Sequence, residues 1–218
     1  MGFSSESYTF MTMCRLQKDN NFTVIFKFSD RLCKLLLNEK NLINMEYIYN
    51  YKSPLGDIRL SSDGTSLIGL WFNKQKYFAD SLNEKYEFKS LPIFDETINW
   101  LDIYFSGKAP NFTPKIKMKT TDFRKSVWEI MLTIPYGETM TYGKIAKIIA
   151  KQKGLSKMSA QAVGGAVSHN SISLIIPCHR VVGTNGNLTG YAGGIDKKIK
   201  LLRLEKADMS RFFIPKRL

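Results

Sequence analysis

The sequence predicts an α+β fold in which a β-rich part precedes a mainly helical part. Two observations support this prediction. Residues 45–114 contain short runs of alternating apolar and polar residues separated by turn residues, a pattern typical of strands and hairpins. Residues 115–218 contain four stretches with apolar residues at helical spacing, three of which begin at a Ser, Thr or Asp that can cap a helix.

Size and composition narrow the class of protein. The chain has 218 residues and a mass of 25.0 kDa, which is enough for one large domain or two small ones. Its 44% apolar and 23% charged residues exclude a disordered or collagen-like chain. No run approaches about 20 apolar residues, so we expect no membrane partner. The N-terminus lacks a signal-peptide pattern, so we expect the protein in the cytoplasm, or in the nucleus of a eukaryote. We also expect a monomer.

The charge is distributed unevenly along the chain. Residues 1–114 carry 13 basic and 13 acidic side chains, whereas residues 115–218 carry 19 basic and 6 acidic ones. The net charge of +13 therefore lies entirely in the helical part. A basic half joined to a neutral half favours a polyanion such as nucleic acid as the partner, although a basic surface can also serve solubility alone.

The first part of the chain divides into an extension and a β-rich region. Residues 1–44 form an extension with a strand-like run over 22–28 and a capped helix over 29–37, and Met45 is a possible alternative start of translation. Beyond it, the pattern predicts strands, a helix that ends at a glycine, and a proline-containing linker. Their ranges are strands over 45–53, 56–64 and 66–73, a helix over 96–107 and a linker over 108–121.

The second part reads as helices around one buried strand. Thr121 or Asp122 can cap the first helix, Thr141 the second, and Ser156 or Ser159 the third. The second and third helices follow one another closely, which is compatible with a helix-turn-helix. The β-branched run before Cys178 predicts a buried strand, and five glycines then predict a loop. The ranges are helices over 121–134, 142–150, 160–168 and 196–207, a strand over 172–176 and a loop over 183–194.

Cys178 is the candidate nucleophile of the sequence. An isolated buried cysteine is usually a small hydrophobic residue. Here Pro177 ends the predicted strand, so the sulfur should lie where the chain turns, and His179 and Arg180 both favour the reactive thiolate. Glu205, in the last helix, supplies a carboxylate that can orient His179. A Cys–His–Glu set of this kind suits a cysteine hydrolase equally well.

Neither Cys14 nor Cys33 has a histidine or further cysteine nearby. We therefore expect them to be inert, with no disulfide scaffold, no metal site and no cofactor.

Three segments resemble one known family. The segments are FRKSVWEIMLTIPYGETMTYGKIA (123–146), AVGGAVSHN (162–170) and IPCHRVVGTNGNLTGYAGG (176–194). In this order they resemble the O6-alkylguanine-DNA alkyltransferases, also called methylated-DNA–protein-cysteine methyltransferases, over residues 45–207. SPLGDIRL near residue 53 resembles the start of that family's N-terminal, ribonuclease-H-like domain. The resemblance implies a DNA-binding domain with a helix-turn-helix after it.

The resemblance also implies a reaction and its residues. The alkyl group of O6-alkylguanine, and possibly of O4-alkylthymine, passes from duplex DNA to Cys178, which is not regenerated. No cofactor is needed, because the alkylated base is itself the activated donor. His179 would act as the base through a water, oriented by Glu205, while Asn170 would brace the cysteine turn. Tyr142 would donate to N3 of the departing guanine.

The same resemblance implies two binding surfaces. The helix over 160–168 would enter the minor groove, which carries little sequence information, and small residues would let its backbone lie close to DNA. The lesion would be flipped into a pocket beside the cysteine, at a cost of a few kcal/mol. The implied DNA-binding residues are Ser159, Gln161, Ala162, Gly164, Gly165 and Arg180. The implied base-pocket residues are Val181, Tyr191, Ala192, Gly193 and Gly194.

Two positions depart from the family's pattern. Gln161 stands where many members carry an arginine that fills the space left by the flipped base. Glutamine can hydrogen-bond the orphaned base but adds no attraction for phosphate, so we expect the many lysines to compensate. Ala192 replaces a serine of some relatives, which changes little if only its backbone is used.

Three alternative functions remain at the level of sequence. A lesion sensor of the same fold would bind alkylated DNA without a reaction, although such proteins lack the acceptor cysteine. A cysteine hydrolase would turn over repeatedly. A plain DNA-binding module would not depend on Cys178.

Overall fold

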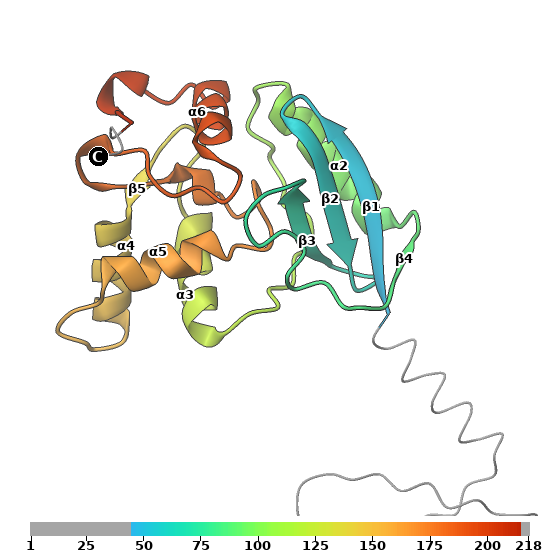
Figure 1. The fold of residues 1–218 in the computed structure, drawn as a ribbon, viewed down its shortest axis with the longest axis horizontal. Helices are drawn as coiled ribbons and strands as arrows, with labels where there is room; N and C mark the ends of the chain where they lie inside the picture. The colour runs from blue at the N-terminus through green and yellow to red at the C-terminus, as the bar shows by residue number, and fades with distance from the viewer. Residues whose placement is uncertain (1–44, 215–218) are drawn as a thin grey trace, which may run out of the picture. The chain divides into compact units, whose positions relative to one another are not determined.

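The computed structural model describes residues 45–214, and the structural statements that follow concern this part of the chain. From Glu46 onward the chain forms one compact unit, with a sheet layer followed by a helical layer (Figure 1). This arrangement confirms the predicted α+β class. The strand and helix predicted over 22–28 and 29–37, together with Cys14 and Cys33, lie outside the described residues.

Four strands form the sheet, in the order β3-β2-β1-β4. The first three make an antiparallel meander, and the fourth pairs parallel to β1. The sequence does not predict β4, because it has only three residues and all of them are exposed, so no alternation marks it. The strands are β1 (Glu46–Ser53), β2 (Gly56–Ser62), β3 (Leu67–Phe72) and β4 (Tyr86–Phe88).

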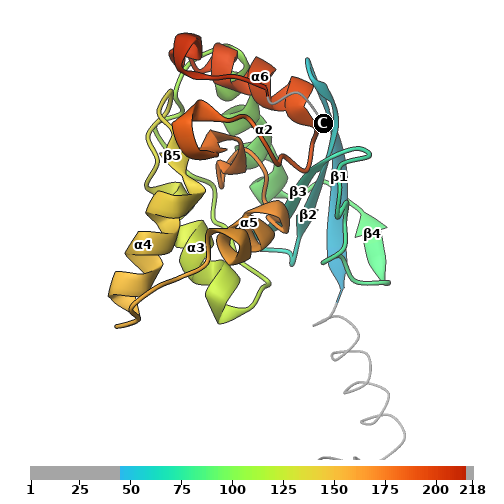
Figure 2. The ribbon, with the colours of Figure 1, turned by 60° about the vertical axis from the view of Figure 1, so that its left-hand side comes forward.

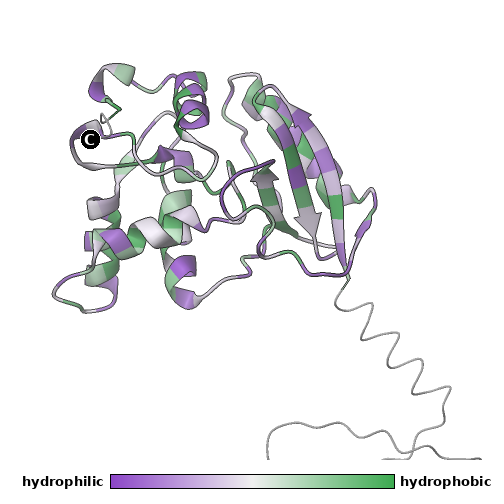
Figure 3. Cartoon of the chain, in the orientation of Figure 1, coloured by the Kyte–Doolittle hydropathy of each residue, from purple (hydrophilic) through white to green (hydrophobic). Residues whose placement is uncertain are grey.

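One helix, α2 (Pro92–Phe105), packs against β1, β2 and β3. It begins four residues before the predicted helix, because Pro92 occupies the first turn, where its missing N–H costs nothing. Its Leu101 and Tyr104 are fully buried, whereas Ile98 is half-buried. Polar and apolar residues alternate along β2, whereas β3 carries no charged residue and is buried throughout (Figure 3). This part of the chain therefore supplies one buried tyrosine close to the boundary between the layers.

The helical layer lies beyond the β3 edge of the sheet (Figures 1 and 2). The predicted caps are confirmed: the side chains of Thr121, Thr141 and Ser159 accept backbone N–H groups at 3.4, 3.1 and 3.3 Å. The helices are α3 (Asp122–Leu132), α4 (Tyr142–Gln152), α5 (Ala160–Ser168) and α6 (Ile195–Leu204). The short elements are β5 (Met140–Thr141), β6 (Val181–Val182) and the 3-10 turns η1 (Cys178–Arg180), η2 (Thr184–Gly186) and η3 (Met209–Arg211).

The strand predicted over 172–176 is wrong. The segment is a buried turn with a single bridge to β3, where the N–H of Leu70 donates to Ser171 O at 2.8 Å. Leu174 has a φ of 70°, which no strand residue adopts. The Asn170 side chain holds both ends of the segment, donating to Ile176 O and accepting from Ile172 N. Local side-chain hydrogen bonds have outcompeted the β preference of these apolar residues.

A single hydrophobic cluster joins the two layers. It includes Leu60 and Phe72 of the sheet and Val127 and Trp128 of α3. The segment predicted as a linker contributes to this continuity, since Ile116 forms a bridge with Leu67. The division of the chain into domains at residue 114 stays a prediction. No helix within residues 45–214 is long and apolar enough to cross a membrane.

Candidate active site

Cys178 begins the 3-10 turn η1, directly after Pro177. Only 3% of the residue is exposed, and its N–H donates to Ile176 O at 2.8 Å. Burial raises the pKa of the Cys178 thiol, while hydrogen bonding from Asn170 and the nearby charge of Lys198 oppose part of that rise. The resting sulfur is therefore a protonated, shielded thiol that needs a base before it can react.

Asn170 fixes the position of the sulfur. Its Nδ2 donates to Ile176 O at 2.7 Å and to Cys178 Sγ at 3.1 Å, while its Oδ1 accepts from Ile172 N at 3.0 Å. A donor aimed at sulfur stabilises the thiolate relative to the thiol. The residue that ends α5 is His169, so Asn170 is the brace of the cysteine turn and not the helix cap.

His179 and Glu205 form a fully buried pair, with His179 Nε2 2.7 Å from Glu205 Oε1. Burial lowers the pKa of His179, although the Glu205 carboxylate opposes this. A neutral ring whose Nε2–H donates to Glu205 has its lone pair on Nδ1. This Nδ1 is buried and accepts no hydrogen bond from the described residues. It is therefore the nitrogen that can accept a proton.

Glu205 is the centre of a buried polar network. It accepts from Arg180 Nε at 2.8 Å, from Tyr104 Oη at 2.7 Å and from Gly137 N at 3.1 Å. Burial by itself would raise its pKa, but His179 and the permanently charged Arg180 hold it well below its usual range. The carboxylate stays ionised at neutral pH and fixes the tautomer of His179.

Arg180, which the resemblance implies as a DNA-binding residue, has its guanidinium turned to partners inside the protein. The residue is buried, its guanidinium forks onto Glu205, and its Nη1 donates to Ile134 O at 2.7 Å. Every one of these partners lies inside the protein. We therefore assign Arg180 to the support of Glu205, because a bidentate guanidinium–carboxylate pair fixes geometry as well as charge.

Tyr142, the expected donor to the departing guanine, lies beside the loop that carries most of the expected base-pocket residues. Tyr142, the first residue of α4, donates from its hydroxyl to Gly190 O at 3.0 Å. Burial raises the pKa of Tyr142 to about 12, so it stays a donor at neutral pH. The ring of Tyr191 lies 6.5 Å from that of His179, and a Cβ at Gly193 would come within 2.7 Å of the Tyr191 ring.

The other expected pocket residues lie in this loop and in β6. Ala192 accepts Lys76 N–H through its carbonyl at 2.9 Å, and Gly194 precedes α6 with a φ of 91°, which favours glycine. Val181 lies in β6 and pairs with Met140 of β5. The loop is thus tied to the sheet layer through Ala192 and continues directly into α6 after Gly194.

Sequence reasoning missed two residues of the site, Lys198 and Tyr104. Lys198 is fully buried, and its Nζ donates to Val181 O at 2.6 Å and Thr189 O at 3.0 Å. Burial lowers the pKa of Lys198 to about 8. A signal for it existed: Lys198 precedes the buried Leu201 and Leu202 by three and four residues, so helical spacing places it on their face.

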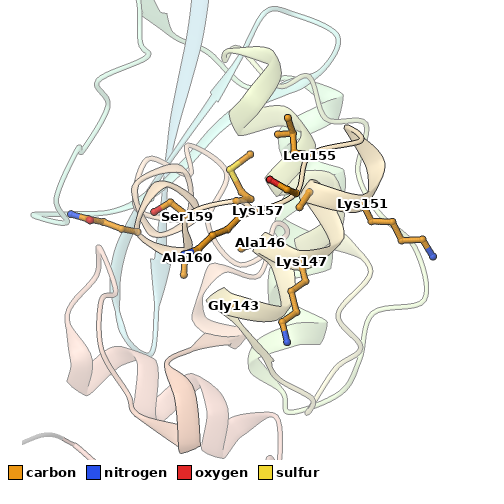
Figure 4. A pocket seen from close by; sticks show the side chains of 12 residues that line it. Gly143, Ala146, Lys147, Lys151, Leu155, Lys157, Ser159 and Ala160 are labelled. Carbon is orange, nitrogen blue, oxygen red and sulfur yellow. The ribbon is translucent and has the colours of Figure 1, made fainter.

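The expected DNA-binding residues form a separate set on α5. Gln161, Ala162 and Gly165 are exposed, and Ser159 caps the helix. Gly164 faces inward, where an added Cβ would lie 4.0 Å from the Tyr142 ring. An open hollow, lined by α4, the following turn and the start of α5, adjoins this surface (Figure 4). The structure thus places the reactive thiol and the small-residue helix face in one unit.

Two family descriptions match this architecture. Residues 45–118 match the ribonuclease-like domain of 6-O-methylguanine DNA methyltransferase, and residues 122–207 match its DNA binding domain. A ribonuclease-like sheet followed by this DNA-binding domain, with its buried cysteine, defines the class of the 6-O-methylguanine DNA methyltransferases.

Known proteins agree with this class. A protein of Methanosarcina mazei named methylated-DNA–protein-cysteine methyltransferase is 44% identical over 163 residues, covering 75% of this chain and 99% of that protein. The crystal structure of the Mycobacterium tuberculosis O6-methylguanine methyltransferase has a TM-score of 0.63 at 40% identity, covering 77% of this chain and 94% of that one. A structure of that organism's protein in complex with DNA has a TM-score of 0.62 at 38% identity, with the same coverage. The chain belongs to the methylated-DNA–protein-cysteine methyltransferase family.

Proposed function

We propose that this protein repairs O6-alkylguanine in duplex DNA by transferring the alkyl group to Cys178, once per molecule. One observation carries the assignment to Cys178. Its sulfur accepts a hydrogen bond from Asn170 at 3.1 Å and adjoins His179, whose proton-accepting nitrogen is left without a protein partner by the Glu205 pair. Family membership and the solved complex of a relative with DNA support the substrate.

The residues suggest how the proton and the alkyl group move. His179 Nδ1 takes the thiol proton of Cys178 through a water, and Glu205 stabilises the resulting imidazolium. The thiolate then attacks the alkyl carbon, so that a carbon–sulfur bond forms as the carbon–O6 bond breaks. The electron pair leaves with guanine, and Tyr142 donates a proton to its N3. The imidazolium proton returns to Tyr142, giving neutral guanine and an alkylated cysteine.

The buried setting fits a reaction that occurs once. A thiol whose pKa is raised by burial resists adventitious oxidation while no lesion is bound. The Tyr142 hydroxyl donates to Gly190 O while no lesion is bound, and it would donate to the base instead once the lesion is bound. The donor is therefore already beside the base-pocket loop before the reaction. Asn170 already holds the Cys178 sulfur and Glu205 already orients His179, and such positioning favours rapid attack.

The proposal is tested by mass spectrometry of the protein mixed with an equal amount of duplex containing one O6-methylguanine. We expect one methyl group on the peptide that contains Cys178, with normal guanine restored in the duplex. The same duplex without the lesion is the control. Tight binding with the methyl group still on DNA would indicate a lesion sensor, and repeated turnover would indicate a hydrolase.

A second measurement addresses the neutral residue on α5. Gln161 is exposed on the second position of the helix. Gln161→Arg adds one positive charge there, so we expect tighter binding to duplex DNA and a dependence of affinity on salt that is steeper by about one phosphate contact. The assay is a salt titration of binding, together with the rate of methyl transfer. Identical binding and repair by both proteins would show that position 161 does not contact the duplex.

Two further properties stay predictions. A DNA substrate requires access to the genome, so we expect the protein in the cytoplasm, or in the nucleus of a eukaryote. We also expect it to act as a monomer, because one copy already carries the acceptor, its base and the helix face.

A further inference from the structure

Three lysines gather beside the exposed face of α5. Lys147 and Lys151 lie one turn apart on α4, and Lys157 lies in the turn that leads to α5. All three are exposed, and they line the same hollow as Gln161 and the cap residue Ser159. Figure 4 shows Lys147 and Lys151 projecting from α4, with Lys157, Ser159 and Ala160 on the segment that faces it.

Their charges are uncompensated. No acidic residue occurs in the sequence between Glu138 and Asp196. Among residues 45–214, no ion pair involves any of the three lysines. Like charges four residues apart, as at Lys147 and Lys151, destabilise a helix slightly. A hollow that gathers positive charge in this way is complementary to a row of phosphates.

We propose that Lys147, Lys151 and Lys157 bind the phosphate backbone of duplex DNA and extend its contact from α5 onto α4 and the turn. They would supply the attraction for phosphate that the neutral Gln161 lacks. The proposal rests on the proposed function for the identity of the polyanion. It concerns binding alone, since the lysines lie on the outer face of the helix-turn-helix and Cys178 is buried.

The test replaces the three lysines by glutamine in the full chain and measures affinity for an unmodified duplex between 50 and 200 mM salt. Each phosphate contact contributes about 0.9 to the slope of log affinity against log salt. Loss of three contacts should make this slope shallower by about 2.7. Between 50 and 200 mM salt, the affinity of the variant should therefore fall by a factor about 40 times smaller than the affinity of the parent does. The rate of reaction with free O6-methylguanine base, which needs no DNA contact, should be unchanged.

A matched variant controls for net charge. Lys52, Lys108 and Lys115 are exposed and belong to the sheet layer and the segment after it, so their replacement by glutamine removes the same charge elsewhere. We expect this variant to keep nearly the parent slope. Equal slopes for the two triple variants, or a parent slope in the α4 variant, would overturn the proposal. Failure of the parent to transfer methyl would refute the proposed reaction but would leave these binding slopes interpretable.

An independent observation concerns the loop over 73–82, which follows β3 and contacts three parts of the site. Buried Gln75 accepts from Ser173 Oγ at 3.4 Å, in the turn before Cys178. Lys76 N–H donates to Ala192 O at 2.9 Å, in the base-pocket loop. The ring of Tyr77 stacks on that of His169 at the end of α5, with centroids 3.9 Å apart.

The backbone of this loop is strained. Lys74, Tyr77 and Ala79 have φ values of 63°, 59° and 55°, a region that residues with a Cβ rarely adopt. Residues in this region persist where the surrounding structure holds them. Here the surroundings that hold Tyr77 are the His169 ring and the Lys76–Ala192 hydrogen bond.

We infer that Tyr77 is a positioning residue that keeps the base-pocket loop in register with α5. The inference rests on the proposed function, because it assigns that loop to the base. His169 is in turn tied to the helix, since its Nδ1 lies 2.8 Å from Gly165 O. The sheet layer contains no reacting group, yet through Tyr77 it would set the distance between the helix that holds DNA and the loop that receives the base.

The test compares Tyr77→Ala, Tyr77→Phe and the control Tyr86→Ala, which removes an exposed aromatic ring from β4. Misplacement by about 1 Å can slow a positioned reaction by on the order of 10²-fold. We expect Tyr77→Ala to slow methyl transfer at saturating duplex by at least about tenfold, with little change in affinity for unmodified DNA. Tyr77→Phe should restore the rate, because only the ring stacks. An unchanged rate in Tyr77→Ala, or no rescue by phenylalanine, would overturn the inference, whereas no transfer by the parent refutes the reaction itself.

Discussion

Replacement of Cys178 by serine should abolish methyl transfer and leave DNA binding intact. A serine hydroxyl at this position is protonated and a far weaker nucleophile than a thiolate, so the rate should fall by on the order of 10³-fold or more. The expected readouts are no methylated peptide after mixing with a duplex that contains O6-methylguanine, and an affinity for that duplex within a few-fold of the parent. Cys178 is buried away from the exposed face of α5, which explains why binding should survive.

The stability of this variant must be measured beside its activity. Serine keeps the size of the side chain and can accept the Asn170 hydrogen bond, so thermal unfolding should shift by only a few degrees. A methyl group found on another residue of the serine variant would contradict the assignment of Cys178 as the acceptor.

Removal of the Glu205 carboxylate should have the largest effect on stability. Glu205→Leu leaves the buried guanidinium of Arg180 without its anion, and breaking a buried pair in this way costs about 3–5 kcal/mol. For a chain of this size the midpoint of thermal unfolding should fall by roughly 6–20 °C. The exposed Glu138→Leu is the matched control and should change the midpoint little.

The milder Glu205→Gln separates folding from chemistry. Glutamine retains an acceptor for His179 but no longer stabilises its protonated form, so methyl transfer at neutral pH should slow even where the protein is folded. The measurement is the single-turnover rate at a temperature well below the midpoint of unfolding. A parent rate in this variant would show that the carboxylate does not act through His179.

The same carboxylate makes stability depend on acid. The pKa of Glu205 in the folded protein lies well below its usual value of 4.5. The unfolded chain therefore binds a proton first, and the stabilisation from ionised Glu205 is present above about pH 4.5 and is lost progressively as the pH falls below it. Thermal unfolding of the parent between pH 6 and pH 3 should show this loss, and Glu205→Gln should show a shallower one.

Local sequence signals predicted much of the fold and the centre of the site. The caps at Thr121, Thr141 and Ser159 are short-range features that depend on residues within one turn, and all three are confirmed. The His179–Glu205 contact joins residues 26 positions apart. It was predicted because a histidine that acts as a base beside a cysteine is commonly oriented by a carboxylate.

The features that were missed depend on contacts between distant segments. The run over 172–176 has every local mark of a strand, but Asn170 and β3 hold it as a turn. The resemblance implied Arg180 as a DNA-binding residue, yet the buried carboxylate of Glu205 holds its guanidinium inside the protein. Lys198 was overlooked because a charged residue is expected to be exposed, although its spacing places it on the buried face of α6.

The hydroxyl of Tyr104 has a consequence for the use of this fold in engineering. It reaches Glu205 from α2, a helix of the sheet layer, across 101 positions of sequence. A fragment that begins after residue 114 would carry Cys178, His179 and the helix-turn-helix. Its Glu205 would lack the hydrogen bond from Tyr104, and its hydrophobic core would lose the residues that the sheet layer contributes. Grafting the thiol chemistry onto another scaffold would therefore require this phenol, or a substitute for it, as part of the transplanted unit.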